Sequence, residues 1–265
     1  RLYIIDKLEG AGTGYNMPGV MVLEGDLDRE QFEAAFKELV TRHETLRTSY
    51  EMLEGETVQR VHEEIEFKIS YQEADEAEIE NRIQGFIKPF DLSKAPLLRV
   101  GLIKLNDTKH VLLYDMHHII SDGVSMGLLV QEFNSLYQGQ TLPELRIQYK
   151  DYAAWQNELF KTGKIQKQEE YWIKTFQGEI PVLNLATDYV RPALQSFEGG
   201  SIQFNLEAEI AAKINQLAQQ TGSTLYMVLL AAYNVLLAKY TGQEDIIVGS
   251  PIAGRPHADL ENIIG

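Results

Sequence analysis

The residues of this chain best suited to chemistry are seven in a row, His117 to Gly123, with the sequence HHIISDG. Histidine titrates near neutral pH, so it can take a proton from a nucleophile. A helix is predicted directly after this segment, and the first turn of a helix leaves backbone N–H groups free, including that of Gly123. Such groups can stabilise a developing oxyanion. A base beside an oxyanion site indicates acyl transfer.

The element before this segment decides which histidine can face a substrate. Residues 111–118 have the β-branched and apolar pattern of a strand, in which successive side chains point to opposite faces. His117 and His118 must therefore diverge, and only one of them can face a given cavity. Residues 124–133 carry apolar side chains at positions 124, 128, 129 and 133 and no proline, which predicts an amphipathic helix packed on that strand.

Plainer interpretations exist for each residue. Two adjacent histidines can be one core residue and its exposed neighbour, and Asp122 can serve simply as the N-cap of the next helix. Together, however, the four defined positions of the pattern HHxxxDG arise by chance in on the order of one chain in a few thousand. A metal site is disfavoured, because neighbouring strand residues diverge and no further ligand has suitable spacing. His43-Glu44 does not begin a zincin motif, since Arg47 stands where the second histidine is required.

Five segments of the chain together resemble a known family, the condensation domains of nonribosomal peptide synthetases, which share a fold with chloramphenicol acetyltransferase. The segments resemble the family's five signatures and follow in the family's order from one end of the chain to the other. They are Arg1–Tyr3 with Leu8, Arg42–Thr48, Met116–Ser125, Tyr149–Trp155 and Val248–Arg255.

The resemblance implies an α/β (α+β) fold with a mixed sheet and the two-lobed architecture of chloramphenicol acetyltransferase. Family members are longer, and this sequence stops just after the fifth signature, so we expect the second lobe to be incomplete. The predicted division is an N-terminal lobe at 1–180 with the HHxxxDG motif, a linker at 181–200 rich in proline, glycine and polar residues, and the first part of the C-terminal lobe at 201–265.

The resemblance also implies an activity. A donor acyl or peptidyl thioester reacts with the amine of an acceptor aminoacyl thioester to form a peptide bond. Both substrates are held on the phosphopantetheine arms of upstream and downstream peptidyl carrier domains, and an adenylation domain is adjacent. The domain itself binds no cofactor or metal. The context of Ser121 and Ser125 favours an L-configured donor.

The family's site residues transfer to this sequence position by position. His118 becomes the catalytic base, and Gly123 turns the chain beside the substrate, where a side chain would crowd the tunnel. His117 becomes a supporting residue, and Asp122 pairs with an arginine, for which Arg47 is preferred and Arg42 is the alternative. The residues expected along the substrate tunnel are Ser121, Ser125, Gly249, Pro251 and Gly254, and Arg255 is expected to form a structural pair.

The composition of the chain limits the classes of partner that it can bind. The chain has 24 basic and 39 acidic residues and a net charge of −15. Binding to a phosphate backbone requires clustered Lys and Arg, so this charge argues against nucleic acid as a partner. The longest apolar stretch, residues 225–238, is too short to span a bilayer. We expect a cytoplasmic protein with no membrane partner. The chain has no cysteine, so a partner must supply any thiol.

Three alternatives remain open. A coenzyme A-dependent acyltransferase of the same fold would share the histidine motif but not the other four signatures. An epimerization or cyclization domain is the second alternative, and His117 argues against cyclization domains because these carry aspartate at that position. The third is a platform that recruits carrier or tailoring proteins without catalysis, which the presence of His118 and Asp122 disfavours.

The remaining pattern predicts alternating strands and helices. Asp28 with Gln31 marks a helix start, and the apolar stripe of that helix includes His43, for which we predict packing. The other predicted elements are a strand at 20–23, a hairpin at Glu54-Gly55, a strand at 65–71, a helix at 75–87, a hairpin at Asn106-Asp107, helices at 149–162 and 167–176, and, in the second lobe, a strand at 201–206, helices at 207–220 and 224–239 and a strand at 245–249. The helix at 224–239 lacks a wide polar face, which predicts a buried central helix.

Overall fold

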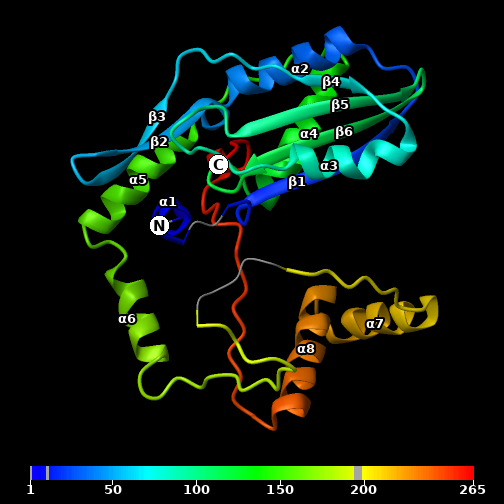
Figure 1. Cartoon of the computed structure of the whole chain (residues 1–265). Coiled ribbons are helices and arrows are strands. Elements are labelled where there is room, and N and C mark those ends of the chain that lie inside the picture. Colours follow the sequence, from blue (N-terminus) through cyan, green and yellow to red (C-terminus); the bar gives the residue numbers. More distant parts are fainter. Residues whose placement is uncertain (1, 10–11, 194–198) are drawn as a thin grey trace. The chain divides into compact units, whose positions relative to one another are not determined.

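A four-stranded sheet carries the HHxxxDG segment at one strand end. The computed structural model describes residues 2–9, 12–193 and 199–265 (Figure 1), so Arg1, with which the first signature begins, lies outside the described residues. The sheet order is β1 (Asn16–Glu24), β6 (Lys109–His117), β5 (Leu98–Asn106) and β4 (Ser70–Glu73). β6 is antiparallel to both neighbours and β4 is parallel to β5, so the predicted mixed sheet is confirmed.

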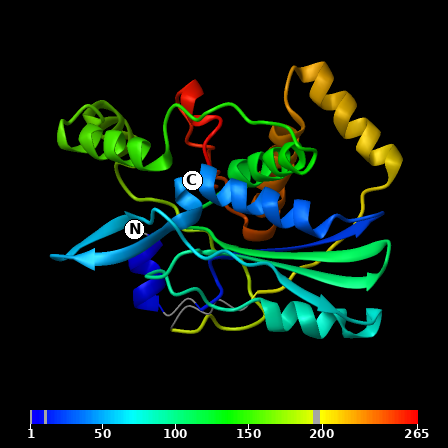
Figure 2. The same ribbon diagram turned by 90° about the horizontal axis from the view of Figure 1, so that it is seen from above.

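Helices cover both faces of this sheet (Figure 2). α2 (Arg29–Arg42) and α4 (Gly123–Tyr137) pack on one face, over a core that includes Leu112 and Met116 of β6. The turn η2 (Glu76–Glu78) and helix α3 (Ile79–Phe86) lie on the other face, where Val111 and Leu113 join a second apolar cluster. The predicted alternation along β6 therefore holds, and odd-numbered residues such as His117 belong to the α3 face.

Local signals place several elements as predicted in this part of the chain, whereas the strand predicted at 65–71 forms only over Ser70–Glu73, as β4. The Asp28 side chain accepts a hydrogen bond from the Gln31 amide and caps α2. The hairpin β2 (Thr48–Leu53) and β3 (Glu56–Val61) turns at Glu54 and Gly55, whose φ values of 51° and 86° lie in the left-handed region. Two consecutive residues with positive φ give the turn the twist that a two-residue hairpin requires.

One glycine of β1 makes a close approach possible. Gly19 faces Tyr114 across the β1–β6 ladder, and a Cβ atom at position 19 would lie 2.0 Å from Cζ of the tyrosine. The tyrosine ring therefore occupies the space that any larger residue at position 19 would need.

The chain divides into two compact units, each described by itself. The first contains residues 1–163 and 253–265, and the second contains Lys164–Ile252. The first unit also holds α1 (Leu2–Glu9), η1 (Glu44–Arg47), α5 (Tyr149–Lys161) and η3 (Ala258–Leu260). These units differ from the predicted lobes, which ended near 180 and kept 201–265 together. Residues 253–265 belong to the first unit because Leu260, Ile263 and Ile264 are buried in it.

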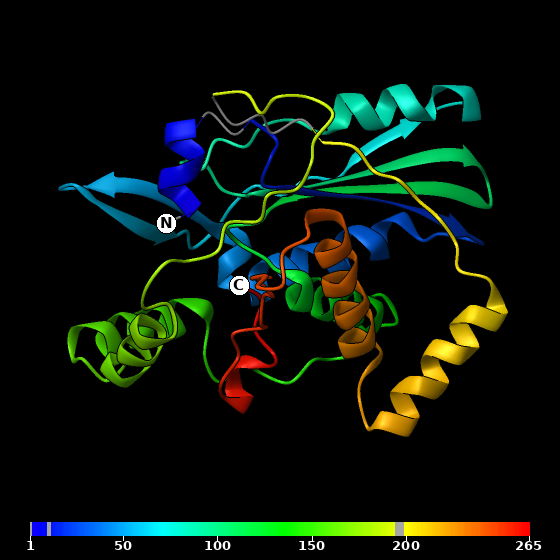
Figure 3. The ribbon, with the colours of Figure 1, turned by 90° about the horizontal axis from the view of Figure 1, so that it is seen from below.

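The second unit contains α6 (Gln166–Thr175), α7 (Ala208–Thr221) and α8 (Leu225–Thr241) (Figure 3). The strands predicted at 201–206 and 245–249 are wrong for the described residues, where both segments run without strand pairing. A strand requires a partner for its backbone groups, and Ile202 and Phe204 are largely exposed.

The prediction that residues 224–239 form a buried helix is half right. The helix forms as α8, but Leu237 is its one buried residue, and Tyr226 and Met227 are exposed. Among the described residues, no single helix is long and apolar enough to cross a membrane. α7 and α8 meet such a test only as a pair, bent by 108°.

Candidate active site at the end of strand β6

The two histidines of the motif lie in opposite environments. His118 directly follows β6, its side chain is exposed, and its backbone N–H donates to the carbonyl of Tyr15 at 2.8 Å. His117 is the last residue of β6 and is 2% exposed. His118 is therefore the histidine that can reach a substrate from this strand end.

The hydrogen bonds of His117 specify its protonation. Nδ1 accepts from the backbone N–H of Ile119 at 3.0 Å, so the neutral ring carries its proton on Nε2, which lies 3.7 Å from Oδ1 of Asp6. Burial lowers the pKa of His117 below its ordinary value, although the Asp6 carboxylate acts in the opposite direction. The rings of Tyr15 and Phe90 lie 6.3 and 6.2 Å away, centroid to centroid. A buried neutral imidazole held in this way has a structural role in the site.

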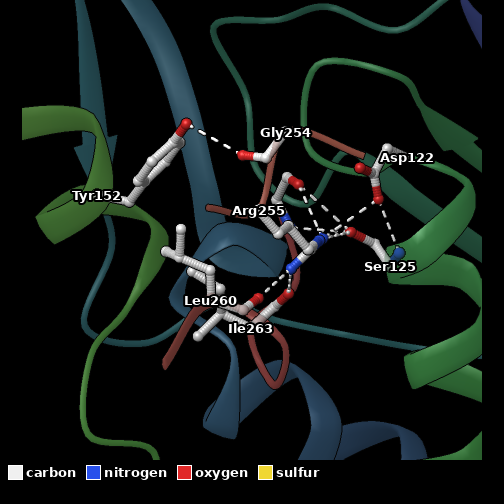
Figure 4. Close-up of polar contacts among 8 residues, drawn as sticks. Asp122, Ser125, Tyr152, Gly254, Arg255, Leu260 and Ile263 are labelled. Atoms are coloured by element: carbon white, nitrogen blue, oxygen red, sulfur yellow. Dashed lines mark hydrogen bonds and ion pairs between the residues drawn. The ribbon is translucent and has the colours of Figure 1, made fainter. Parts of the chain in front are cut away.

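Asp122 is both the N-cap of α4 and part of an ion pair. Its Oδ1 accepts from the Ser125 backbone N–H at 2.7 Å and lies 3.3 Å from Nη2 of Arg255 (Figure 4). Burial alone would raise the pKa of this carboxyl, but the hydrogen bonds from Ser125 and the charge of Arg255 hold its pKa below the ordinary value. The interpretation of Asp122 as a simple N-cap is therefore incomplete.

Arg255 connects the residues after the HHxxxDG motif to the C-terminal segment of the first unit. Nη2 donates to Ser125 Oγ at 2.9 Å, and Nη1 donates to the carbonyls of Leu260 and Ile263 (Figure 4). The hydroxyl of Tyr152 donates to the carbonyl of the preceding residue, Gly254, at 3.3 Å. The fourth and fifth signatures thus meet beside the start of α4.

Both arginines predicted as partners of Asp122, Arg47 and Arg42, are wrong, because each has other partners. Nη1 of Arg47 donates to the carbonyl of His62, and Nη2 lies 3.8 Å from Glu44. Both oxygens of Glu132 accept from Nε of Arg42, at 3.1 and 3.2 Å.

Arg42 belongs to a separate buried cluster. Nε2 of His43 lies 2.6 Å from Oε2 of Glu132, so a polar cluster of Arg42, His43 and Glu132 joins the end of α2 to α4. His43 is buried, as its predicted packing role requires, and its ring is held by the hydrogen bond to Glu132.

The remaining predicted site residues have different surroundings. Ser121 and Ser125 are buried, and Oγ of Ser121 has no hydrogen-bond partner among the described residues. Gly123 is exposed, and a Cβ atom there would meet nothing within 4 Å of the described chain, so crowding of a substrate by a side chain stays a prediction. Gly254 has a φ of 65°, a conformation that favours glycine.

Two tunnel residues fall in the other unit. Gly249 and Pro251 belong to the second compact unit, and their role in a tunnel stays a prediction. Within the described parts of the chain, no group of three or more His, Cys, Asp or Glu side chains is arranged to hold a metal ion.

Sequence reasoning missed a polar network that supports the strand end. Asp115 is fully buried and bonds to Asn16 and Arg99. The signal was present, because an aspartate inside an apolar strand, two residues before His117 and on the same face, requires a buried partner.

Comparison with known proteins decides the family. The family model described as Condensation domain matches residues 1–265. The chain belongs to the condensation-domain family. Over its whole length the domain is 57% identical to tyrocidine synthase 3 from Brevibacillus parabrevis and 56% identical to gramicidin S synthase 2 from Brevibacillus brevis. It spans only 4% and 6% of those two synthetases.

Solved structures agree on the fold. The condensation domain from monacolin K polyketide synthase superimposes with a TM-score of 0.85 at 23% identity, covering 100% of this chain and 64% of that one. The X-domain from teicoplanin biosynthesis gives 0.82 at 26% identity, covering 95% and 59%. The predicted family and fold class are confirmed, and condensation domains of nonribosomal peptide synthetases catalyse amide-bond formation.

Proposed function

We propose that this condensation domain joins a donor acyl or peptidyl thioester to the amine of an acceptor aminoacyl thioester, with an L-configured donor. The upstream and downstream peptidyl carrier domains present both substrates on phosphopantetheine arms, and an adenylation domain works beside them in the cytoplasm. The absence of cysteine from the chain agrees with thiols supplied by partners.

The observation that carries this proposal is the exposed imidazole of His118 at the end of β6, followed by a helix start that Asp122 and Arg255 hold in place. The acceptor amine attacks the thioester carbonyl, a C–N bond forms and the C–S bond breaks. His118 takes the proton from the amine and delivers it to the departing thiolate, so one amide and one free thiol result. Holding the amine in attack geometry contributes to the rate as well.

The start of α4 supplies the second element of the proposed chemistry. The backbone N–H groups of Gly123 and Val124 belong to the first helical turn and have no acceptor within the helix. They are suited to donate to the oxyanion that develops on the thioester carbonyl oxygen. The hydrogen bonds that Asp122 accepts from Ser125 and Arg255 keep this turn in place.

The deciding experiment follows dipeptide formation between two loaded carrier proteins by mass spectrometry, using the protein as its gene encodes it. We expect His118→Ala to keep its circular dichroism spectrum and to lose about 10²- to 10⁴-fold in rate. The matched control is His257→Ala, which removes another exposed histidine of the same unit and should leave the rate unchanged.

Two results would contradict the proposal. A folded His118→Ala variant that keeps the wild-type rate would exclude His118 as the base. A wild-type protein that makes no product with several carrier pairs would favour the alternative of a platform that recruits partners without catalysis.

A further inference from the structure

A buried carboxylate lies inside the strand that delivers the active-site histidines. Asp115 is 0% exposed and stands two residues before His117, on the same face of β6. A buried charge is costly unless it is paired and hydrogen-bonded. Its partners therefore show what the carboxylate holds.

One oxygen of this carboxylate ties together three strands. Oδ2 accepts from Nδ2 of Asn16 on β1 at 2.7 Å and from Nη1 of Arg99 on β5 at 3.0 Å. In the strand register Arg99 lies opposite Asp115, and Asn16 lies opposite His117. The three side chains cross-link β1, β6 and β5 at the end of the sheet where the HHxxxDG motif begins.

The arginine extends this network to an aromatic ring that contacts His117. Arg99 donates to the carbonyls of Lys88 and Pro89, at 2.6 and 2.7 Å. Its guanidinium lies 3.6 Å from the ring centroid of Phe90, and the Phe90 ring meets the His117 ring edge-on at 89°. Arg99 thus holds the segment 88–90 against the buried histidine.

The asparagine extends the network to His118. Asn16 also donates to the carbonyl of Lys88 at 2.9 Å, so its side-chain amide nitrogen bridges β6 and the segment 88–90. The residue before it, Tyr15, accepts the backbone N–H of His118 at 2.8 Å. A displacement of Asn16 is therefore transmitted through one peptide unit to the backbone that carries His118.

We propose that Asp115 is a positioning residue for His118, acting through Asn16 and Tyr15 on one side and through Arg99, Phe90 and His117 on the other. This inference rests on the proposed function, in which His118 is the acting base. Asp115 itself does not touch the substrate.

The electrostatics separate positioning from simple stabilisation. Burial raises the pKa of Asp115 above its ordinary value, although the bond from Asn16 and the charge of Arg99 act in the opposite direction. The fold therefore favours the neutral form of this carboxyl over the ionised form, and a neutral amide of the same shape should destabilise it less than Asp115→Ala does. Arg99 keeps its two carbonyl acceptors when the carboxylate is removed.

The chain offers a matched control. Glu132 is a second buried carboxylate bonded to an arginine, but it joins α2 to α4 and is not part of the β6 network. Asp115→Asn and Glu132→Gln each remove one buried charge and keep the side-chain shape. Asp115→Ala also removes the oxygen that accepts from Asn16 and Arg99. Comparison of Asp115→Asn with Asp115→Ala therefore tests whether the conservative variant keeps part of the function.

The test measures three quantities on each variant: the midpoint of thermal unfolding, amide hydrogen exchange of the peptide containing His118, and kcat and KM in the dipeptide assay. For Asp115→Ala we expect about tenfold faster exchange at His118 and about tenfold lower kcat with KM unchanged, and smaller effects for Asp115→Asn. For Glu132→Gln we expect a lower unfolding midpoint with both other quantities unchanged.

Equal changes of exchange and kcat in Asp115→Ala and Glu132→Gln, in proportion to lost stability, would overturn the proposal, because Asp115 would then be a structural residue only. The proposal would also be overturned if the amide of His118 exchanged at the same rate in Asp115→Ala as in wild type. The exchange measurement does not depend on catalysis, so it decides the positioning role even if His118→Ala shows that the proposed function is wrong.

Discussion

Nη2 of Arg255 lies 3.3 Å from Oδ1 of Asp122, although 133 positions separate the two residues in the sequence. The pair joins the last part of the HHxxxDG motif to the end of the fifth signature. The side chain of Arg255 is 10% exposed and that of Asp122 is 31% exposed, so the pair is partly shielded from water. The start of α4 therefore depends on a segment that is far from it in the sequence.

Arg255→Ala should lower the free energy of unfolding by about 1–3 kcal/mol, because it removes the charged partner of Asp122 and the side-chain donor to the carbonyls of Leu260 and Ile263. Urea denaturation, followed through a signal that reports on the first unit, measures this loss. Arg146→Ala is the control, since Arg146 pairs with Asp259 but is 81% exposed, and it should change stability by less than about 1 kcal/mol. Equal losses in the two variants would show that the Arg255 contacts do not stabilise the fold.

The charge of Asp122 should stabilise the fold only above its lowered pKa. The folded-state pKa lies below the ordinary value of about 3.9. The stabilisation is therefore complete above about pH 4 and is lost as the pH falls through the folded pKa. Asp122→Asn keeps a capping side chain and removes the charge. We expect wild type to be more stable than Asp122→Asn at pH 6 and the difference to shrink toward pH 3; a difference that grows with acid would contradict the assigned direction.

Acid should also act through His117. Its folded-state pKa lies below the ordinary value of about 6.5, so the neutral ring favours the fold. The contribution is present above about pH 6.5 and is lost as the pH falls below it. Chemical denaturation between pH 8 and pH 5 should show falling stability in wild type and a shallower fall in His117→Asn. Some slope will remain, because burial lowers the pKa of His110 too. An unchanged slope would mean that His117 titrates normally.

Gly19→Ala should destabilise the first unit by about 1–3 kcal/mol, because the new methyl group would overlap the Tyr114 ring. Gly127→Ala is the matched control, since Gly127 lies inside α4 and a Cβ atom there meets nothing within 4 Å. That change should stabilise by about 0.4–1 kcal/mol. Thermal unfolding of both variants checks the opposite signs, and a neutral Gly19→Ala would show that Tyr114 moves aside at no cost.

Much of the first unit could be predicted from the order of its residues, because the deciding interactions are local. The cap at Asp28, the turn at Glu54-Gly55 and the alternation along β6 each depend on a few neighbouring positions. Alternation also separated His117 from His118, and the structure buries the first and exposes the second. The motifs predicted the family, which the comparisons confirm.

The tertiary structure decided which charged groups meet. From the sequence, Arg47 and Arg42 are the expected partners of Asp122, and Arg255 is expected to form only an unspecified structural pair. Local sequence carries no information about a contact over 133 positions, so the choice of Arg255 came only from the packing of residues 253–265. The same holds for the network of Asp115, Asn16 and Arg99, which forms because strand register brings β1, β6 and β5 side by side. Periodicity predicts which face a side chain occupies, whereas register and long-range packing determine what it finds there.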